Sequence, residues 1–370
     1  MNEIRLLILD DDLEVINSFQ GAIDRINRDD KNNLEYKVYT AKTLQEAEEI
    51  IKYNKLDTAV IDLNLNNDNR VDPDNSDGNQ AIEKLMQNFR MPIFVVSGEL
   101  TKLNESLQQN ELIIQKNRDD FSRESGFETI IPPRFLSKSI HYFARDGFLE
   151  QKINKFYWEH LSQTIKSWEN VEKEYPEEIE KILSRHTLSC LNEELYVNGN
   201  IGSFDKYHPG EMYIIPPIKK HYHTGDIVEK DGDKFIIINP ACDIVNKDKM
   251  EYYTLVKIFK AIDLPKIENK QDASKISYIN DNLKKANKLD RYHFLPAFDI
   301  IDHDYVIAFQ NLFIIEIGEI TKTTYSEYLS ERESNIKEYK KIASIASPFL
   351  KDIIARFSAY YARQGQPNFL

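Results

Sequence analysis

Five polar side chains in the N-terminal third of the chain each stand at the end of a short apolar run. Asp10 and Asp11, here called the acidic pair, follow the run "RLLIL", and Asp62 follows "TAVI". Ser97 follows "IFVV", and Lys116 closes "ELIIQK". In a doubly wound parallel sheet, ligands bind just beyond the carboxyl ends of the strands. We therefore expect these five side chains to converge at one edge of such a sheet.

The carboxylates in this set favour a bound divalent cation. Neighbouring carboxylates raise one another's pKa unless a positive charge neutralises them. Mg²⁺ prefers hard oxygen ligands, and carboxylates are the commonest of these in proteins. The repulsion between adjacent acids is explained if Mg²⁺ binds there, so we predict a magnesium site at this edge.

The elements that must position these residues alternate between strand and helix patterns. The runs "IRLLIL", "KVYTA", "TAVIDL", "PIFVVSG" and "ELIIQK" are short and mostly apolar, as expected for parallel strands covered on both faces. Between them lie amphipathic stretches, of which the first has an apolar stripe at Ile16, Phe19, Ile23 and Ile26 and a plausible N-cap at Asp12. This βαβ series predicts an α/β fold, a flavodoxin-like, doubly wound parallel sheet of five strands.

The order of these residues resembles the receiver domain of bacterial two-component response regulators. The resemblance covers residues 1–120 and implies that the acidic pair holds Mg²⁺, with Asp62 and the main-chain carbonyl of Asn64 completing the metal shell. It also implies that Asp62 accepts a phosphoryl group from a partner histidine kinase in a phosphorelay. Ser97 would be the switch hydroxyl and Lys116 the cation that binds the phosphate. The spacings between Asp62, Ser97 and Lys116 each leave room for one helix and one return strand.

Some features of the sequence differ from that family pattern. The loop "NLNNDNRVDPDNSDG" after the acceptor is long, and we expect it to cover the site or to bind a partner. Asn117 stands where the family usually has proline, and no fifth helix is obvious after it. The face that receivers use for homodimers or for output is therefore open to change. A receiver-like adaptor that is never phosphorylated stays an alternative.

Three further segments follow residue 120. The sequence predicts a linker and helical coupling segment at 121–200, with a polar start and a helical period over 138–195. Residues 201–320 predict a small β-rich domain resembling an SH3-like barrel, with a hairpin turn at Asp231-Gly232. Residues 321–370 predict C-terminal helices, the last opening at Ser347-Pro348.

A second, speculative site lies in the β-rich part. His221, His223, Cys242 and Asp243 are residue types that ligate metals or catalyse reactions. A Cys beside a His could form an activated thiolate, and two His with a Cys could hold Zn²⁺. These residues would make the chain an effector enzyme gated by the receiver. The structural alternative is that Cys242 is a small buried residue and Asp243 caps a turn.

The bulk composition narrows the function classes. The 370 residues carry a formal net charge of −13, which argues against nucleic acid as a partner, because phosphate contacts need a basic face. No apolar run approaches the roughly 20 residues that span a bilayer. The start "MNEIRLLILD" has no signal-peptide pattern, and two cysteines make no disulfide framework. We expect a cytoplasmic protein whose favoured chemistry is phosphoacceptance alone; whether it is an enzyme stays open.

Overall fold

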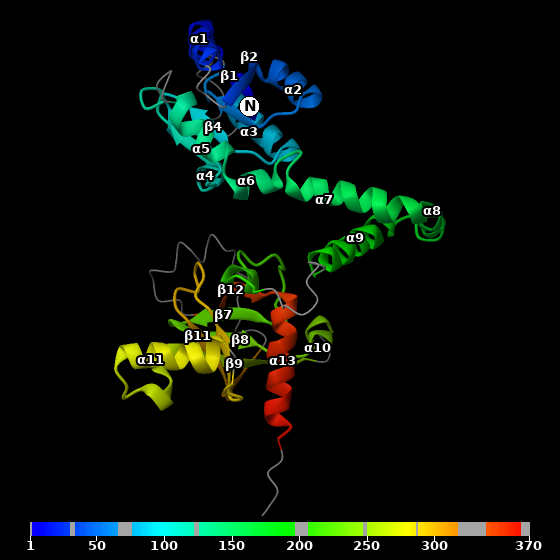
Figure 1. The fold of residues 1–370 in the computed structure, drawn as a ribbon, viewed down its shortest axis with the longest axis vertical. Coiled ribbons are helices and arrows are strands. Elements are labelled where there is room, and N and C mark those ends of the chain that lie inside the picture. Colours follow the sequence, from blue (N-terminus) through cyan, green and yellow to red (C-terminus); the bar gives the residue numbers. More distant parts are fainter. Residues whose placement is uncertain are drawn as a thin grey trace, which may run out of the picture. The chain divides into compact units, whose positions relative to one another are not determined.

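The computed structural model divides the chain into two compact units, Met1–Ile201 and Gly202–Leu370 (Figure 1). It describes residues 2–29, 34–65, 76–121, 126–196, 206–246, 250–285, 288–316 and 338–363. Most of the long loop after Asp62, residues 66–75, lies outside the described residues. The four-part domain division drawn from the sequence stays a prediction.

A five-stranded parallel sheet forms the centre of the first unit. Its strands are β1 (Asn2–Leu9), β2 (Leu34–Ala41), β3 (Thr58–Ile61), β4 (Ile93–Val96) and β5 (Ile113–Lys116). Their order is β2-β1-β3-β4-β5, and every pair is parallel. This is the flavodoxin-like order, in which the chain reverses direction across the sheet at β1 and β3. The predicted α/β fold is confirmed for this unit.

Helices cover both faces of this sheet (Figure 1). They are α1 (Leu13–Arg28), α2 (Leu44–Tyr53), α3 (Asp77–Asn88), α4 (Glu105–Gln108) and α5 (Ile131–Phe135), with a 3-10 turn η2 (Leu100–Lys102) and a π-helical turn η3 (Gly126–Ile130). Because strand side chains alternate, Leu6 and Ile8 pack with α1 while Leu7 and Leu9 pack with α2 and α3. The predicted stripe of α1 is buried, and Asp12 caps the helix by accepting from the Glu14 amide.

The stretch after β5 departs from the sequence interpretation. It is polar overall and was predicted as a linker, yet Phe121, Phe127 and Ile131 are buried in the core beside α1. The Tyr36 hydroxyl on β2 donates to the Phe127 carbonyl at 2.6 Å. Phe121 and residues 127–131 thus pack on the face of the sheet that α1 also covers.

The first unit continues into a run of helices. These are α6 (Lys138–Phe143), α7 (Phe148–Phe156), α8 (Ile165–Glu174) and α9 (Ile179–Tyr196), with η4 (Tyr157–Leu161) and η5 (Ser162–Thr164) between α7 and α8. Helix α9 returns along α7, where Lys152 pairs with Glu194 at 2.7 Å and the rings of Phe156 and His186 meet (Figure 1). The structure thus has helices in the region that the sequence predicts as helical.

The second unit is built on a seven-stranded antiparallel sheet. The strands are β6 (Tyr213–Ile214), β7 (Asp226–Lys230), β8 (Asp233–Ile237), β9 (Tyr252–Lys260), β10 (Tyr292–Leu295), β11 (Tyr305–Glu316) and β12 (Lys340–Ile345), in the order β10-β11-β9-β8-β7-β12-β6. The β7–β8 hairpin turns at Asp231 and Gly232, both with positive φ, as predicted. The Tyr213 hydroxyl of β6 donates to the Pro296 carbonyl beyond β10, so the two end strands approach each other over one core.

The helices of this unit are α10 (Ala241–Val245), α11 (Asp272–Ile279) and α13 (Ser347–Tyr361), with short turns η6 (Pro209–Met212), η8 (Ala261–Asp263), η9 (Pro265–Ile267) and η10 (Asn280–Lys284). Strand β12 lies inside 321–370, which the sequence predicts as helical; all six of its residues are buried between β7 and β6. The SH3-like barrel stays a prediction.

No helix in the described part of the chain combines the length and apolarity needed to cross a membrane.

Gly78 at the start of α3 fixes the chain beside Asp62. A Cβ atom on Gly78 would lie 2.6 Å from Leu63 Cα and 2.8 Å from the Asp62 carbonyl oxygen. Because both are backbone atoms, we expect Gly78→Ala to lower the free energy of unfolding by about 1–3 kcal/mol, the usual cost of overpacking. Urea denaturation measures it.

Gly21→Ala is the matched control, since a Cβ there meets nothing within 4 Å. Inside helix α1 this change should raise the free energy of unfolding by up to about 1 kcal/mol. A Gly78→Ala protein as stable as the wild type would show that the close approach of Gly78 to the backbone of Asp62 and Leu63 does not constrain the fold.

Candidate metal centre

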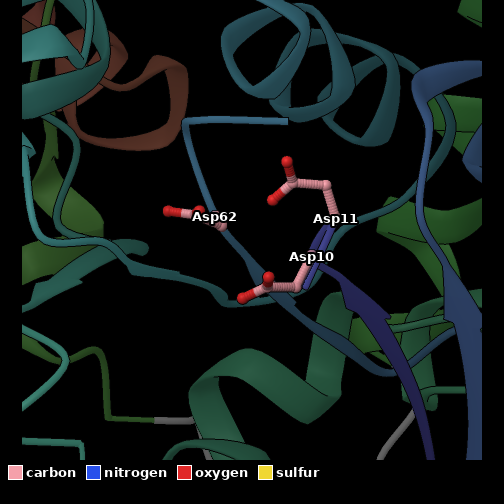
Figure 2. A group of neighbouring side chains, drawn as sticks. All are labelled: Asp10, Asp11 and Asp62. Atoms are coloured by element: carbon pink, nitrogen blue, oxygen red, sulfur yellow. The ribbon is translucent and has the colours of Figure 1, made fainter. Parts of the chain in front are cut away.

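Three carboxylates meet at the carboxyl edge of the parallel sheet. Asp10 and Asp11 follow β1, and Asp62 follows β3, which pairs directly with β1. One oxygen from each lies within 4.8 Å of the others (Figure 2). The Asp62 amide donates to the Leu9 carbonyl at 2.8 Å. This bond extends the pairing of β1 and β3 by one residue and holds Asp10 and Asp62 side by side. Here this trio is called the acidic cluster.

Burial makes this cluster electrostatically costly. Asp62 is 2% exposed and Asp10 4% exposed, while Asp11 is more open to solvent. The Oδ1 atom of Asp62 is buried and has no hydrogen-bond partner among the residues that the structure describes. A buried acceptor without a partner is destabilising, and native structures contain few of them. An unpaired carboxylate oxygen beside two other carboxylates fits a cation with oxygen ligands, such as Mg²⁺.

The proton affinity of the cluster reflects this burial. Burial raises the pKa of Asp10 to about 6, and the charge of Asp62 adds to the effect, while the hydrogen bond from the Asp12 amide opposes it. Burial also raises the pKa of Asp11, again with help from Asp62. Both carboxylates therefore favour a nearby positive charge at neutral pH.

Among the described residues, Arg118 is the cation paired with the cluster, and it was not one of the predicted site residues. The Nη2 atom of Arg118 lies 2.6 Å from Asp62 Oδ2 and 3.5 Å from Asp10 Oδ2. Arg118 also borders a cavity of about 680 Å³ lined by Ser18, Arg25 and Phe121 among others. The signal was available, because Arg118 stands two residues beyond β5 and therefore at the same edge of the sheet as the acids.

The other predicted residues of this edge, Ser97, Asn64 and Lys116, are not paired with the acidic cluster in the described part of the chain. Ser97 is fully buried at the end of β4, and its Oγ accepts from the Glu99 amide at 3.3 Å. The Asn64 side chain accepts from Lys102 Nζ at 2.9 Å. Lys116 ends β5, but its ammonium forms no ion pair with the acidic cluster among the described residues. The structure thus gathers the three acids and places Arg118, rather than Lys116, on Asp62.

The speculative C-terminal residues do not form a cluster. Cys242 is exposed on α10, not buried as the structural alternative expected, and its thiol lies 3.4 Å from Asp243 Oδ1. His223 is tied by its backbone amide to Asp226, and His221 by its carbonyl to Lys341. Neither imidazole hydrogen-bonds to Cys242 in the described part of the chain. Across these described residues, the acidic cluster is the one group of three or more metal-ligating side chains.

Comparisons with known proteins add little to this geometry. No family model matches the sequence, and no curated protein does. Among solved structures, the chain is similar to the signal receiver domain of a putative Luxo repressor protein from Vibrio parahaemolyticus, at 15% identity and a TM-score of 0.28, over 36% of this chain and 90% of that one. It is also similar to a CheY-like response regulator receiver domain protein from Methanospirillum hungatei JF-1, at 18% identity and 0.25, over 35% and 91%.

A third similar structure is a response regulator protein from Burkholderia pseudomallei with a phosphorylated aspartic acid, a calcium ion and citrate. It is 14% identical, has a TM-score of 0.26 and covers 44% of this chain and 85% of that chain. These neighbours are response regulators or their receiver domains. Their TM-scores are too low for the similarity to support an assignment of fold or function. The assignment of the first unit to the flavodoxin-like class rests on its strand order.

The raised pKa of Asp10 predicts how stability depends on pH without metal. Below pH 4 the carboxyl is protonated in both states and has no effect. Between pH 4 and 6 the unfolded chain releases the proton while the folded protein keeps it, so stability falls; above pH 6 the full penalty remains. Asp10→Asn should therefore raise the free energy of unfolding above pH 6 by about 1–3 kcal/mol.

Urea denaturation in EDTA at pH 4, 6 and 7.5 measures this gain, which should shrink toward pH 4. Asn at position 10 can still accept from the Asp12 amide, so the local turn is kept. Asp24→Asn, on the exposed face of α1, is the control and should change little. A gain that is equal at all three pH values would contradict the buried-charge explanation.

Proposed function

We propose that the first unit is a phosphoacceptor in two-component signalling and that Asp62 takes a phosphoryl group from a partner histidine kinase with Mg²⁺ bound. The observation that supports this most is the acidic cluster itself. Three carboxylates from adjacent strand ends lie within 4.8 Å of one another, and one oxygen of the buried Asp62 has no hydrogen-bond partner in the described part of the chain. A cytoplasmic location and output through the second unit belong to the same proposal.

The chain's residues divide the work of such a transfer. A carboxylate oxygen of Asp62 forms the new bond to phosphorus as the bond between phosphorus and the donor histidine nitrogen breaks. Asp10, Asp11, Asp62 and the Asn64 carbonyl would hold Mg²⁺, which supplies positive charge to the transferring phosphoryl oxygens when it is bound. Burial of Asp62 excludes water from one side of the attacking oxygen.

Ser97 and Lys116 would respond to the new charge. Ser97 now accepts from the Glu99 amide, at the start of the η2 turn. The hydroxyl hydrogen can in addition donate to a phosphoryl oxygen. Turning the Ser97 side chain toward that oxygen would move Oγ relative to the Glu99 amide, which gives a route from the site to the surface. Lys116 ends the neighbouring strand β5 and would add a second positive charge to the phosphoryl group.

The adaptor alternative also has a supporting observation. Arg118 already neutralises part of the charge on Asp62. A receiver-like unit that docks a partner without being phosphorylated would need no more than this pair. The phosphoacceptor and the adaptor functions therefore differ in whether Asp62 can be phosphorylated.

Intact-protein mass after incubation with Mg²⁺ and acetyl phosphate tests the choice. We expect a single phosphoryl adduct on the wild type that is lost with EDTA and in Asp62→Asn, because that variant has no nucleophilic carboxylate. Asp119→Asn is the matched control, since Asp119 lines the same cavity and should keep the adduct. A folded wild type that forms no adduct with Mg²⁺ present would support the adaptor function instead.

A further inference from the structure

The guanidinium of Arg118 contacts two of the carboxylates that are predicted to bind Mg²⁺. We propose that Arg118 is an internal counter-cation of the acidic cluster and that Mg²⁺ binds by displacing its guanidinium from Asp62. Arg118 would then set the Mg²⁺ concentration at which the site fills. This inference rests on the proposed metal site, and it is independent of whether a phosphoryl group is transferred.

The contacts place the guanidinium on two of the predicted metal ligands. Nη2 lies 2.6 Å from Asp62 Oδ2 and 3.5 Å from Asp10 Oδ2. Mg²⁺ binds oxygen at about 2.1 Å. A Mg²⁺ ion on Asp62 Oδ2 would thus lie no more than about 4.7 Å from Nη2 in its present position. Like charges at that separation in a buried site repel strongly, so the two cations compete.

The burial of the partners decides which of them moves. The side chain of Arg118 is 42% exposed, whereas those of Asp10 and Asp62 are 5% and 1% exposed. The acids are fixed at strand ends, but the guanidinium can turn into solvent. The backbone beneath Arg118 stays anchored, because the Phe121 amide donates to the Asn117 carbonyl and the Phe121 ring packs on Phe19 and Phe127.

One guanidinium cannot satisfy the whole cluster. Three ionised carboxylates and one arginine leave two formal negative charges, and within the described ranges Asp62 Oδ1 has no hydrogen-bond partner. The pair therefore holds Asp62 in a partly neutralised resting state while leaving the cluster attractive to a divalent ion. Lys116, which the sequence predicts as the cation that binds the phosphate, forms no ion pair with the cluster among the described residues.

Calorimetric titration of the full chain with Mg²⁺ tests the displacement directly. We expect Arg118→Ala and Arg118→Gln to bind Mg²⁺ about tenfold more tightly than the wild type, because no ion pair has to break first. Arg118→Lys keeps a competing charge and should stay close to the wild type. Arg25→Ala is the matched control, because Arg25 is a second arginine that lines the same cavity.

Thermal unfolding in EDTA provides a second readout. Loss of the pair should lower the melting temperature of Arg118→Ala, and saturating Mg²⁺ should raise it by more than it raises that of the wild type. This measurement also shows that the variants are folded.

The outcomes separate the two proposals. Equal or weaker Mg²⁺ binding by Arg118→Ala and Arg118→Gln would overturn the displacement while leaving the metal site intact. If Arg25→Ala bound Mg²⁺ as much more tightly as Arg118→Ala does, the gain in affinity would come from the lower net charge of the protein. That result would also overturn the displacement. No Mg²⁺ binding by the wild type or by any variant would overturn the metal site itself, and the displacement with it.

Discussion

The hydrogen-bond pairing of β1 with β3 is the constraint on which the first unit depends. It brings the acids that follow both strands to one edge and fixes them with backbone hydrogen bonds, such as that from the Asp62 amide to the Leu9 carbonyl. Helices on both faces then remove water from Asp10 and Asp62. The fold therefore creates an electrostatic cost that a positive charge can offset.

The structure meets part of that cost from within the chain. Arg118 reaches back from the turn after β5 and pairs with Asp62 and Asp10. An exposed, movable cation on buried, fixed acids can be exchanged for another cation without disturbing the sheet. In our account, this exchange links a resting unit to a metal-loaded one that can accept a phosphoryl group.

Sequence reasoning succeeded where the pattern was local and repeated. Short apolar runs with acids at their ends were enough to predict the parallel sheet and the meeting of Asp10, Asp11 and Asp62. It failed where a few residues act over distance. The place of Arg118, two residues beyond β5, indicates the same edge of the sheet, but its contact with Asp62 is seen only in the folded structure.

The second unit shows the same limit. Strand β12 lies within 321–370, which the sequence predicts as helical. Its burial depends on β7 and β6, which are distant in sequence. His221, His223 and Cys242 were grouped by residue type. The structure uses the backbone of both histidines to hold the loop before β7, and it exposes Cys242 on α10.

The most direct test of this account is a crystal structure of the chain grown with Mn²⁺, a divalent ion that oxygen ligands also favour. We predict an anomalous peak for Mn²⁺ bound to Asp10 and Asp62, with the Arg118 guanidinium turned away from Asp62. An Arg118 side chain still paired with Asp62, and no peak at the acidic cluster, would contradict the account.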